Sequence, residues 1–168
     1  MFTGRNYSPQ HIYVWLSYIW IAPAVTIALY LGAELMVPEK KKIIVGIYAV
    51  LGIIFEILLF SMPYEVFTFG DPAPGDLTDS GFNRLNPAYW LIVLFLLSLL
   101  IFLAIGFAIK AKQATGELRK KFLYLSIGFL IFFICGVADG LFLPGIYLAA
   151  WRGAMMTFAL FMYLGLKT

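Results

Sequence analysis

The chain alternates between long apolar runs and short polar segments. Each run has about 20–23 residues, and at about 1.5 Å per residue a helix of this length crosses a hydrocarbon layer about 30 Å thick. The pattern therefore predicts an all-α fold, a polytopic bundle of five transmembrane helices that forms one integral membrane domain over residues 1–168. We place the spans at 11–33, 43–62, 87–109, 122–143 and 146–166.

The segments between the spans differ in character. The first span contains Pro23, which predicts a kink near its middle. Residues 63–86 are rich in Pro, Gly and Asp, and predict an irregular outer loop. Residues 110–121 carry five cations and one acid, and predict a basic inner loop. Glu34 lies beside Lys40, Lys41 and Lys42, the lysines of the turn before the second span, which predicts an interfacial ion pair.

The distribution of positive charge predicts the orientation. Nine of the twelve Lys and Arg residues lie in the segments 39–42 and 110–121 or at the C-terminus. Because cytoplasmic loops of membrane proteins are enriched in Lys and Arg, these segments are assigned to the inside. We expect a multi-pass protein of the cell membrane, with the N-terminus outside and the C-terminus in the cytoplasm.

Composition excludes several classes of function. The chain is 62% hydrophobic and 12% charged, so it cannot cover a water-soluble surface. The net charge of +3 comes from the predicted inner segments, and we expect no nucleic-acid partner. A single cysteine, Cys135, and a single histidine, His11, give no disulfide framework and no paired ligands for a metal or haem. No catalytic motif is present, so we expect no enzyme activity, no metal and no cofactor.

Three charged residues are embedded in the apolar runs, and they are the candidate site. Glu56, Asp139 and Arg152 each lie roughly 6–9 Å below the outer boundary, counted at 1.5 Å per residue. Asp139 and Arg152 belong to adjacent antiparallel spans, so they are expected to pair directly. An arginine can also bind two carboxylates, which would let Arg152 hold Glu56 as well.

Helical spacing assigns these charges to inward-facing stripes with small neighbours, which let helices approach closely in lipid. The stripes are Val45, Ala49, Gly52 and Glu56; Gly128, Phe132, Cys135 and Asp139; and Arg152, Met156, Ala159 and Tyr163. Two interpretations remain open. The polar layer either holds the bundle together, or it forms a ligand or proton site open to the outside.

Three segments carry a resemblance to a known family: PEKKKIIVGIYAVLG, GELRKKFLYLSIGFLIFFICGVADGL and the terminal MYLGLK. Together they resemble the membrane-embedded seven-helix input region of archaeal and bacterial sensor histidine kinases, in its last five helices, and related uncharacterised archaeal membrane proteins. This chain departs from that pattern in having five predicted spans. The resemblance implies sensing or regulation through a partner, without catalysis in this chain.

We therefore expect a sensory or regulatory input or accessory subunit. Its expected partners are the lipid bilayer and either another protein or further copies of itself. The alternative is a transporter or channel component whose polar layer lies on a solute or proton path. A membrane enzyme acting on lipid is disfavoured, because nucleophile and metal motifs are missing.

Overall fold

Helices make up most of the structure, a computed structural model that describes residues 11–69, 80–141 and 146–167. The all-α class is confirmed. The fifth predicted run forms helix α8 (Ile146–Leu166). Among the described residues, four helical stretches are long and apolar enough to cross a membrane, and they match the first four predicted spans: Val14–Met36, Pro38–Ser61, Pro87–Gln113 and Gly116–Ala138.

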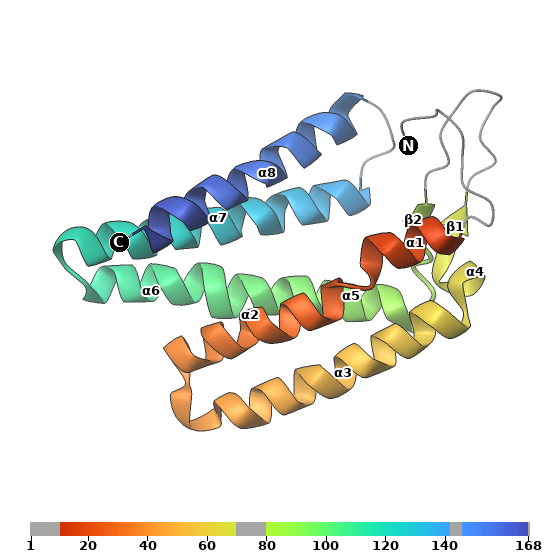
Figure 1. The fold of residues 1–168 in the computed structure, drawn as a ribbon, viewed down its shortest axis with the longest axis horizontal. Coiled ribbons are helices and arrows are strands. Elements are labelled where there is room, and N and C mark those ends of the chain that lie inside the picture. The colour runs from red at the N-terminus through yellow and green to blue at the C-terminus, as the bar shows by residue number, and fades with distance from the viewer. Residues whose placement is uncertain (1–10, 70–79, 142–145, 168) are drawn as a thin grey trace.

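Two antiparallel helix pairs lie on either side of a central helix (Figure 1). In the first pair, α2 (Ile21–Met36) turns through the 3₁₀ segment η1 (Pro38–Lys40) into α3 (Lys41–Ser61). In the second pair, α7 (Gly116–Leu141) packs against α8. Large aliphatic side chains such as Ile27, 66% exposed, cover the outside of the bundle. This apolar surface suits a lipid environment.

The central helix has an irregular middle. It consists of α5 (Pro87–Leu99), the π-helical segment η2 (Leu100–Ile105) and α6 (Gly106–Gln113). Its start follows from the sequence Asn86-Pro87. The Asn86 side chain accepts a hydrogen bond from the Ala88 N–H at 2.9 Å, and proline suits the first helical position because its missing N–H is not needed there.

The predicted basic loop 110–121 is mostly helical, which corrects that prediction. Helix α6 continues to Gln113 and α7 begins at Gly116, so only Ala114 and Thr115 connect them. Gly116 has a φ of +62°, a left-handed conformation that glycine adopts without strain. The turn is therefore short, and most cations of this segment lie on helix ends.

Pro23 interrupts the first span, as predicted, but the break lies four residues earlier. Helix α1 (His11–Tyr18) ends before Ile19, and α2 begins after Trp20. A proline has no N–H to bind the carbonyl of the residue four positions before it, and its ring collides with that carbonyl. For Pro23 this residue is Ile19, so the break falls where the proline demands it.

Glu34 forms an ion pair with Lys41 across the α2–α3 turn. This confirms the predicted interfacial pair and identifies its cation. Because both side chains are partly exposed, the pair contributes little to stability. It does hold the end of α2 beside the start of α3.

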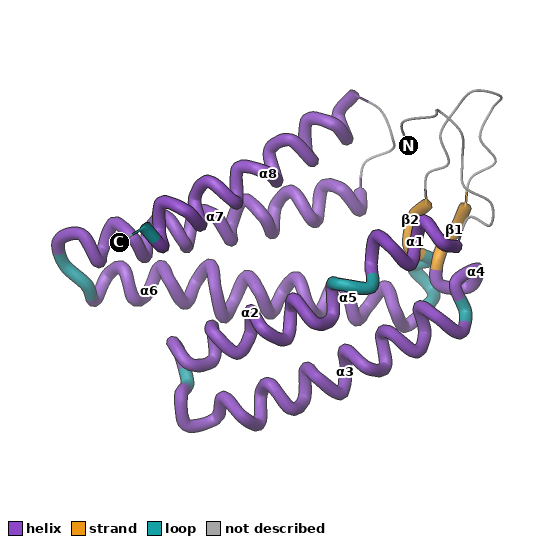
Figure 2. Tube along the Cα trace, in the orientation of Figure 1, coloured by secondary structure: helices purple, strands orange, loops and turns teal. Residues whose placement is uncertain are grey.

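The described parts of segment 63–86, residues 63–69 and 80–86, contain regular structure where an irregular loop was predicted. Helix α4 (Pro63–Val66) is followed by strand β1 (Phe67–Phe69), which pairs antiparallel with β2 (Ser80–Phe82) beside α1 (Figure 2). Phe67 lies opposite Phe82 in the register, with ring centroids 4.5 Å apart. Tyr18 contacts both rings, at 5.1 and 4.9 Å. This aromatic cluster anchors a segment that composition alone assigned to an irregular loop.

Aromatic side chains of α8 enter recesses at glycines of α7. A methyl group added at Gly128 would lie 3.0 Å from Phe161 Cβ. Phe158 packs against Phe129 and Phe132, at 5.1 and 5.2 Å between ring centroids. The predicted α7 stripe is confirmed at the buried Gly128 and Cys135. The predicted α8 stripe is wrong, because all four of its members are exposed: Arg152, Met156, Ala159 and Tyr163.

Candidate functional site

The three embedded charges lie on helix segments at one end of the bundle. Glu56 is in the last two turns of α3, Asp139 is near the end of α7, and Arg152 is in the second turn of α8. These segments lie at the end that carries β1 and β2 (Figure 1). The side chain of Asp139 is outside the described residues, so its pairing with Arg152 stays a prediction.

Glu56 and Arg152 do not meet. Helices α3 and α8 lie on opposite sides of the bundle, with the central helix and α7 between them (Figure 1). Neither carboxylate oxygen of Glu56 has a hydrogen-bond partner among the described residues. The expectation that Arg152 also holds Glu56 is therefore corrected, because equal depth along the helices does not bring distant helices together.

Glu56 lies on the buried side of α3. It follows Gly52 by one helical turn, so the two share a side of the helix. At Gly52 the helices are close, since an added methyl group would lie 3.2 Å from Ala22 Cβ of α2. Phe55 and Leu59, next to Glu56 on this side, are fully buried. The carboxyl group is thus enclosed by apolar packing.

An enclosed carboxyl group without a partner needs a physical explanation. Burial removes its hydration, and a lost hydrogen bond is not replaced. Unsatisfied buried groups are rare in folded proteins, and ionisable residues at membrane depth are functional candidates by default. Glu56 is therefore the strongest candidate of the three predicted residues for a role beyond packing.

Sequence analysis missed a second polar feature, a pair of hydroxyl groups between α3 and α5. The Tyr48 hydroxyl hydrogen-bonds the Ser98 hydroxyl, and Ser98 also donates to the Leu94 carbonyl at 2.7 Å. Ser98 is 4% exposed. A signal was present, because Ser98 is the only Ser or Thr in the uncharged run 87–109.

Tyr48 and Glu56 are eight residues apart on α3, which is about 12 Å along the helix axis. Thr26 of α2 lies between these levels, with its Oγ1 3.8 Å from a methyl group added at Gly52. The Thr26 hydroxyl donates to the Ala22 carbonyl at 2.9 Å. We call Tyr48, Ser98, Thr26 and Glu56 the α3 polar line. These four residues place polar groups at successive heights along α3, where it makes otherwise apolar contacts with α2 and α5.

Trp15 closes the outer end of this contact. Its Nε1–H donates to the Leu59 carbonyl at 3.0 Å. In a continuing helix that carbonyl would accept from the residue four positions later, which is Pro63 and has no N–H. The tryptophan supplies the missing donor. An aromatic residue predicted as part of an interfacial belt thus also ties α1 to the last turn of α3, directly beyond Glu56.

The opposite end of the bundle collects the cations. Nine of the twelve Lys and Arg residues lie on η1, on the adjoining ends of α3, α6 and α7, or just beyond α8 (Figure 1). The two ends of the molecule therefore differ in charge, as the sequence predicted for two sides of a membrane.

No family model matches the chain, and comparison with curated proteins and with solved structures finds no similar protein.

Proposed function

We propose that the chain is a five-span protein of the cell membrane with its N-terminus outside and its C-terminus in the cytoplasm. The fifth span is α8, whose 21 residues run antiparallel to α7. The gathering of nine cations at one end supports the orientation, since cytoplasmic ends are rich in Lys and Arg. In this arrangement β1 and β2 face the outside.

Cysteine labelling tests this topology. In a chain whose Cys135 is replaced by alanine, single cysteines are introduced by Thr68→Cys on β1 and Thr115→Cys in the α6–α7 turn, both exposed positions. A membrane-impermeant maleimide is expected to label Thr68→Cys in intact cells and Thr115→Cys only after permeabilisation. Labelling of both from the same side would contradict the five-span arrangement.

We further propose that the protein is a sensory or regulatory input subunit that acts on a partner protein or on further copies of itself. The observation that carries this proposal is the enclosed carboxyl group of Glu56 on α3, which has no hydrogen-bond partner among the described residues. Binding of a proton or a small ligand at this group changes the cost of its burial. The packing of α2 on α3 then depends on the signal, which is what an input element requires.

A transporter or channel component is the second candidate, and the α3 polar line favours it. Tyr48, Ser98, Thr26 and Glu56 offer hydroxyl and carboxyl groups at successive levels. Such groups could relay a proton if water connected them. The line spans part of the apolar contact, and the Thr26 and Ser98 hydroxyls donate to helix carbonyls.

The test measures proton flux and hydrogen exchange. The purified protein is reconstituted into liposomes that contain a pH-sensitive dye, and a potassium diffusion potential drives proton entry. An input subunit is expected to leave the permeability at the level of protein-free liposomes. A transport component is expected to pass protons, and Glu56→Gln should abolish that flux.

For the input function, hydrogen exchange of α2 and α3 in nanodiscs is compared at acidic and alkaline pH. We expect the protection of these amides, corrected for the intrinsic pH dependence of exchange, to change with pH in the wild type. Glu56→Gln should remove this change, and the control Glu65→Gln, at an exposed carboxylate on α4, should retain it. The elements packed against α3, α1 included, carry other ionisable residues, and no described side chain hydrogen-bonds Glu56. These residues are His11, Tyr13, Tyr18, Tyr30, Glu34, Glu39, Lys40, Tyr64, Glu65 and Tyr89. An equal pH effect in wild type and Glu56→Gln would remove Glu56 as the receiving group.

A further inference from the structure

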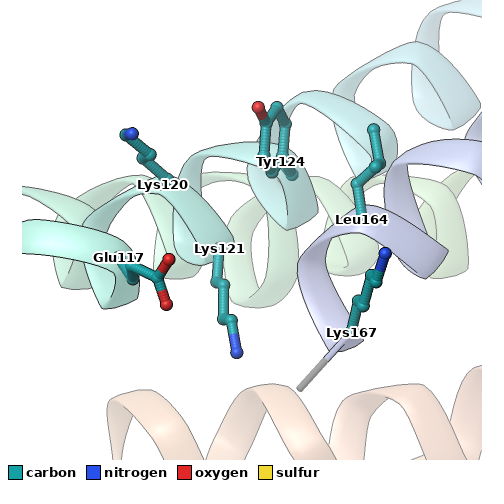
Figure 3. A pocket seen from close by; sticks show the side chains of 6 residues that line it. All are labelled: Glu117, Lys120, Lys121, Tyr124, Leu164 and Lys167. Atoms are coloured by element: carbon teal, nitrogen blue, oxygen red, sulfur yellow. The ribbon is translucent and has the colours of Figure 1, made fainter.

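A hollow lies between the beginning of α7 and the end of α8 (Figure 3). Its volume is about 260 Å³, and it is open to the surroundings on one side. Six residues line it: Glu117, Lys120, Lys121, Tyr124, Leu164 and Lys167. The walls thus combine three ammonium groups and one carboxylate with a tyrosine ring and a leucine.

The positive charge of this hollow is only partly offset by Glu117, since three lysines face one carboxylate. None of the three lysines forms an ion pair within the part of the chain that the structure describes. The Lys167 ammonium lies 5.9 Å from the centre of the Tyr163 ring, a contact that leaves its charge in place. Lys120 and Lys121 follow the first turn of α7, where the helix dipole is also positive. Charge and shape together favour an anion.

The position of the hollow indicates the kind of anion. It lies at the cation-rich end of the bundle, where the apolar part of α7 and α8 gives way to polar residues. Leu160 and Tyr163 precede the lining residues along α8, and their side chains are 56% and 60% exposed. They extend an apolar surface from the hollow toward the middle of the helix. A ligand with an anionic head and apolar tails fits both parts, whereas a soluble phosphate uses only the first.

We propose that this hollow binds the phosphate of an anionic phospholipid headgroup, with the acyl chains along the exposed side of α7 and α8. The lysines contribute charge, and the Tyr124 and Leu164 side chains contribute to the wall of the hollow (Figure 3). The proposal rests on α8 as a membrane span but not on Glu56. Lipid binding would hold the cation-rich ends of α7 and α8 at the headgroups of the leaflet on that side of the membrane.

The experiment is a lipid titration of the full chain in detergent, followed by native mass spectrometry, with phosphatidylglycerol and phosphatidylcholine as probes. We expect the wild type to prefer phosphatidylglycerol. Lys121→Gln with Lys167→Gln should weaken its binding about tenfold or more. The matched control, Lys40→Gln with Lys42→Gln, removes the same charge at the same end of the bundle but outside the hollow, and should bind like wild type.

Three results would overturn the proposal. Equal binding of the two lipids by the wild type would show that the headgroup is not recognised, and this result does not depend on any variant. Equal losses in both double variants would show general attraction by surface charge. Displacement of phosphatidylglycerol by inorganic phosphate would show a site for soluble phosphate. Lys121→Arg with Lys167→Arg, which preserves the charge, should retain binding. The proposal rests on α8 as a membrane span, but the titration uses neither the labelling of cells nor Glu56, so its failure is distinguishable from failure of the tests above.

Discussion

Replacing Gly32 with alanine is expected to destabilise the protein by about 1–3 kcal/mol, the usual cost of adding a group to a filled contact. A methyl group at Gly32 would lie 2.8 Å from Phe102 Cβ and 3.1 Å from the Phe102 carbonyl oxygen. Part of the obstacle is backbone, so the neighbour cannot simply rotate away, and α2 must move from η2. Thermal unfolding in one detergent measures the effect.

Gly46→Ala is the matched control, since it makes the same change in α3 where nothing lies within 4 Å of the added methyl group. Alanine favours a helix over glycine by about 1 kcal/mol, so this variant should be neutral or more stable. Equal destabilisation by the two substitutions would contradict the close contact between α2 and η2.

Arg152→Ala is expected to cost about 3 kcal/mol if Arg152 pairs with Asp139, because removing one partner leaves the other charge uncompensated. The double change Arg152→Ala with Asp139→Asn should cost less, since no unpaired charge remains. The measurement is a double-mutant cycle of thermal unfolding in lipid nanodiscs. Arg152 is exposed on the surface of the helical bundle, so at this depth it would face lipid. The lipid, rather than burial among other helices, would make an unpaired charge costly.

Arg84→Ala provides the control for this cycle. Arg84 is an exposed arginine in the turn before α5, at the same end of the bundle. Its loss should change stability by less than about 0.5 kcal/mol. Additive effects of the Asp139 and Arg152 changes, without coupling beyond error, would show that the two charges do not meet.

Local signals predicted much of the fold. The length of the apolar runs, the Asn86-Pro87 start and the interruption by Pro23 are visible in the sequence because each acts within a few residues. The Glu34–Lys41 pair also spans a short turn. The pairing of β1 with β2 was missed, because it depends on Phe67 and Phe82 meeting Tyr18 from another part of the chain.

The candidate site was only partly predictable for the same reason. Glu56 stands out as a charge in an apolar run, but that no described residue hydrogen-bonds its carboxyl group follows from which helices surround it. The inward-facing stripe of α8 was assigned from the position of Arg152. The side of α8 that contacts α7 is instead decided by the volumes of the facing side chains. Gly128 of α7 leaves room for Phe161 of α8, and Gly165 of α8 leaves room for Leu125 of α7. Helix α8 therefore turns Phe161 and Gly165 toward α7.

The π-helical segment η2 couples the length of the central helix to its orientation. It is a wide turn within a continuous helix, and such turns accommodate one residue more than regular winding allows. Winding the same residues as a regular α-helix would rotate everything beyond η2 by about 100°. Phe107, which packs between Phe122 and Phe129, would then swing away from α7 while Ser98 kept its place beside Tyr48. Segment η2 thus sets the rotation of α6 relative to α5 about the helix axis. One continuous helix can therefore place Ser98 against α3 and Phe107 against α7.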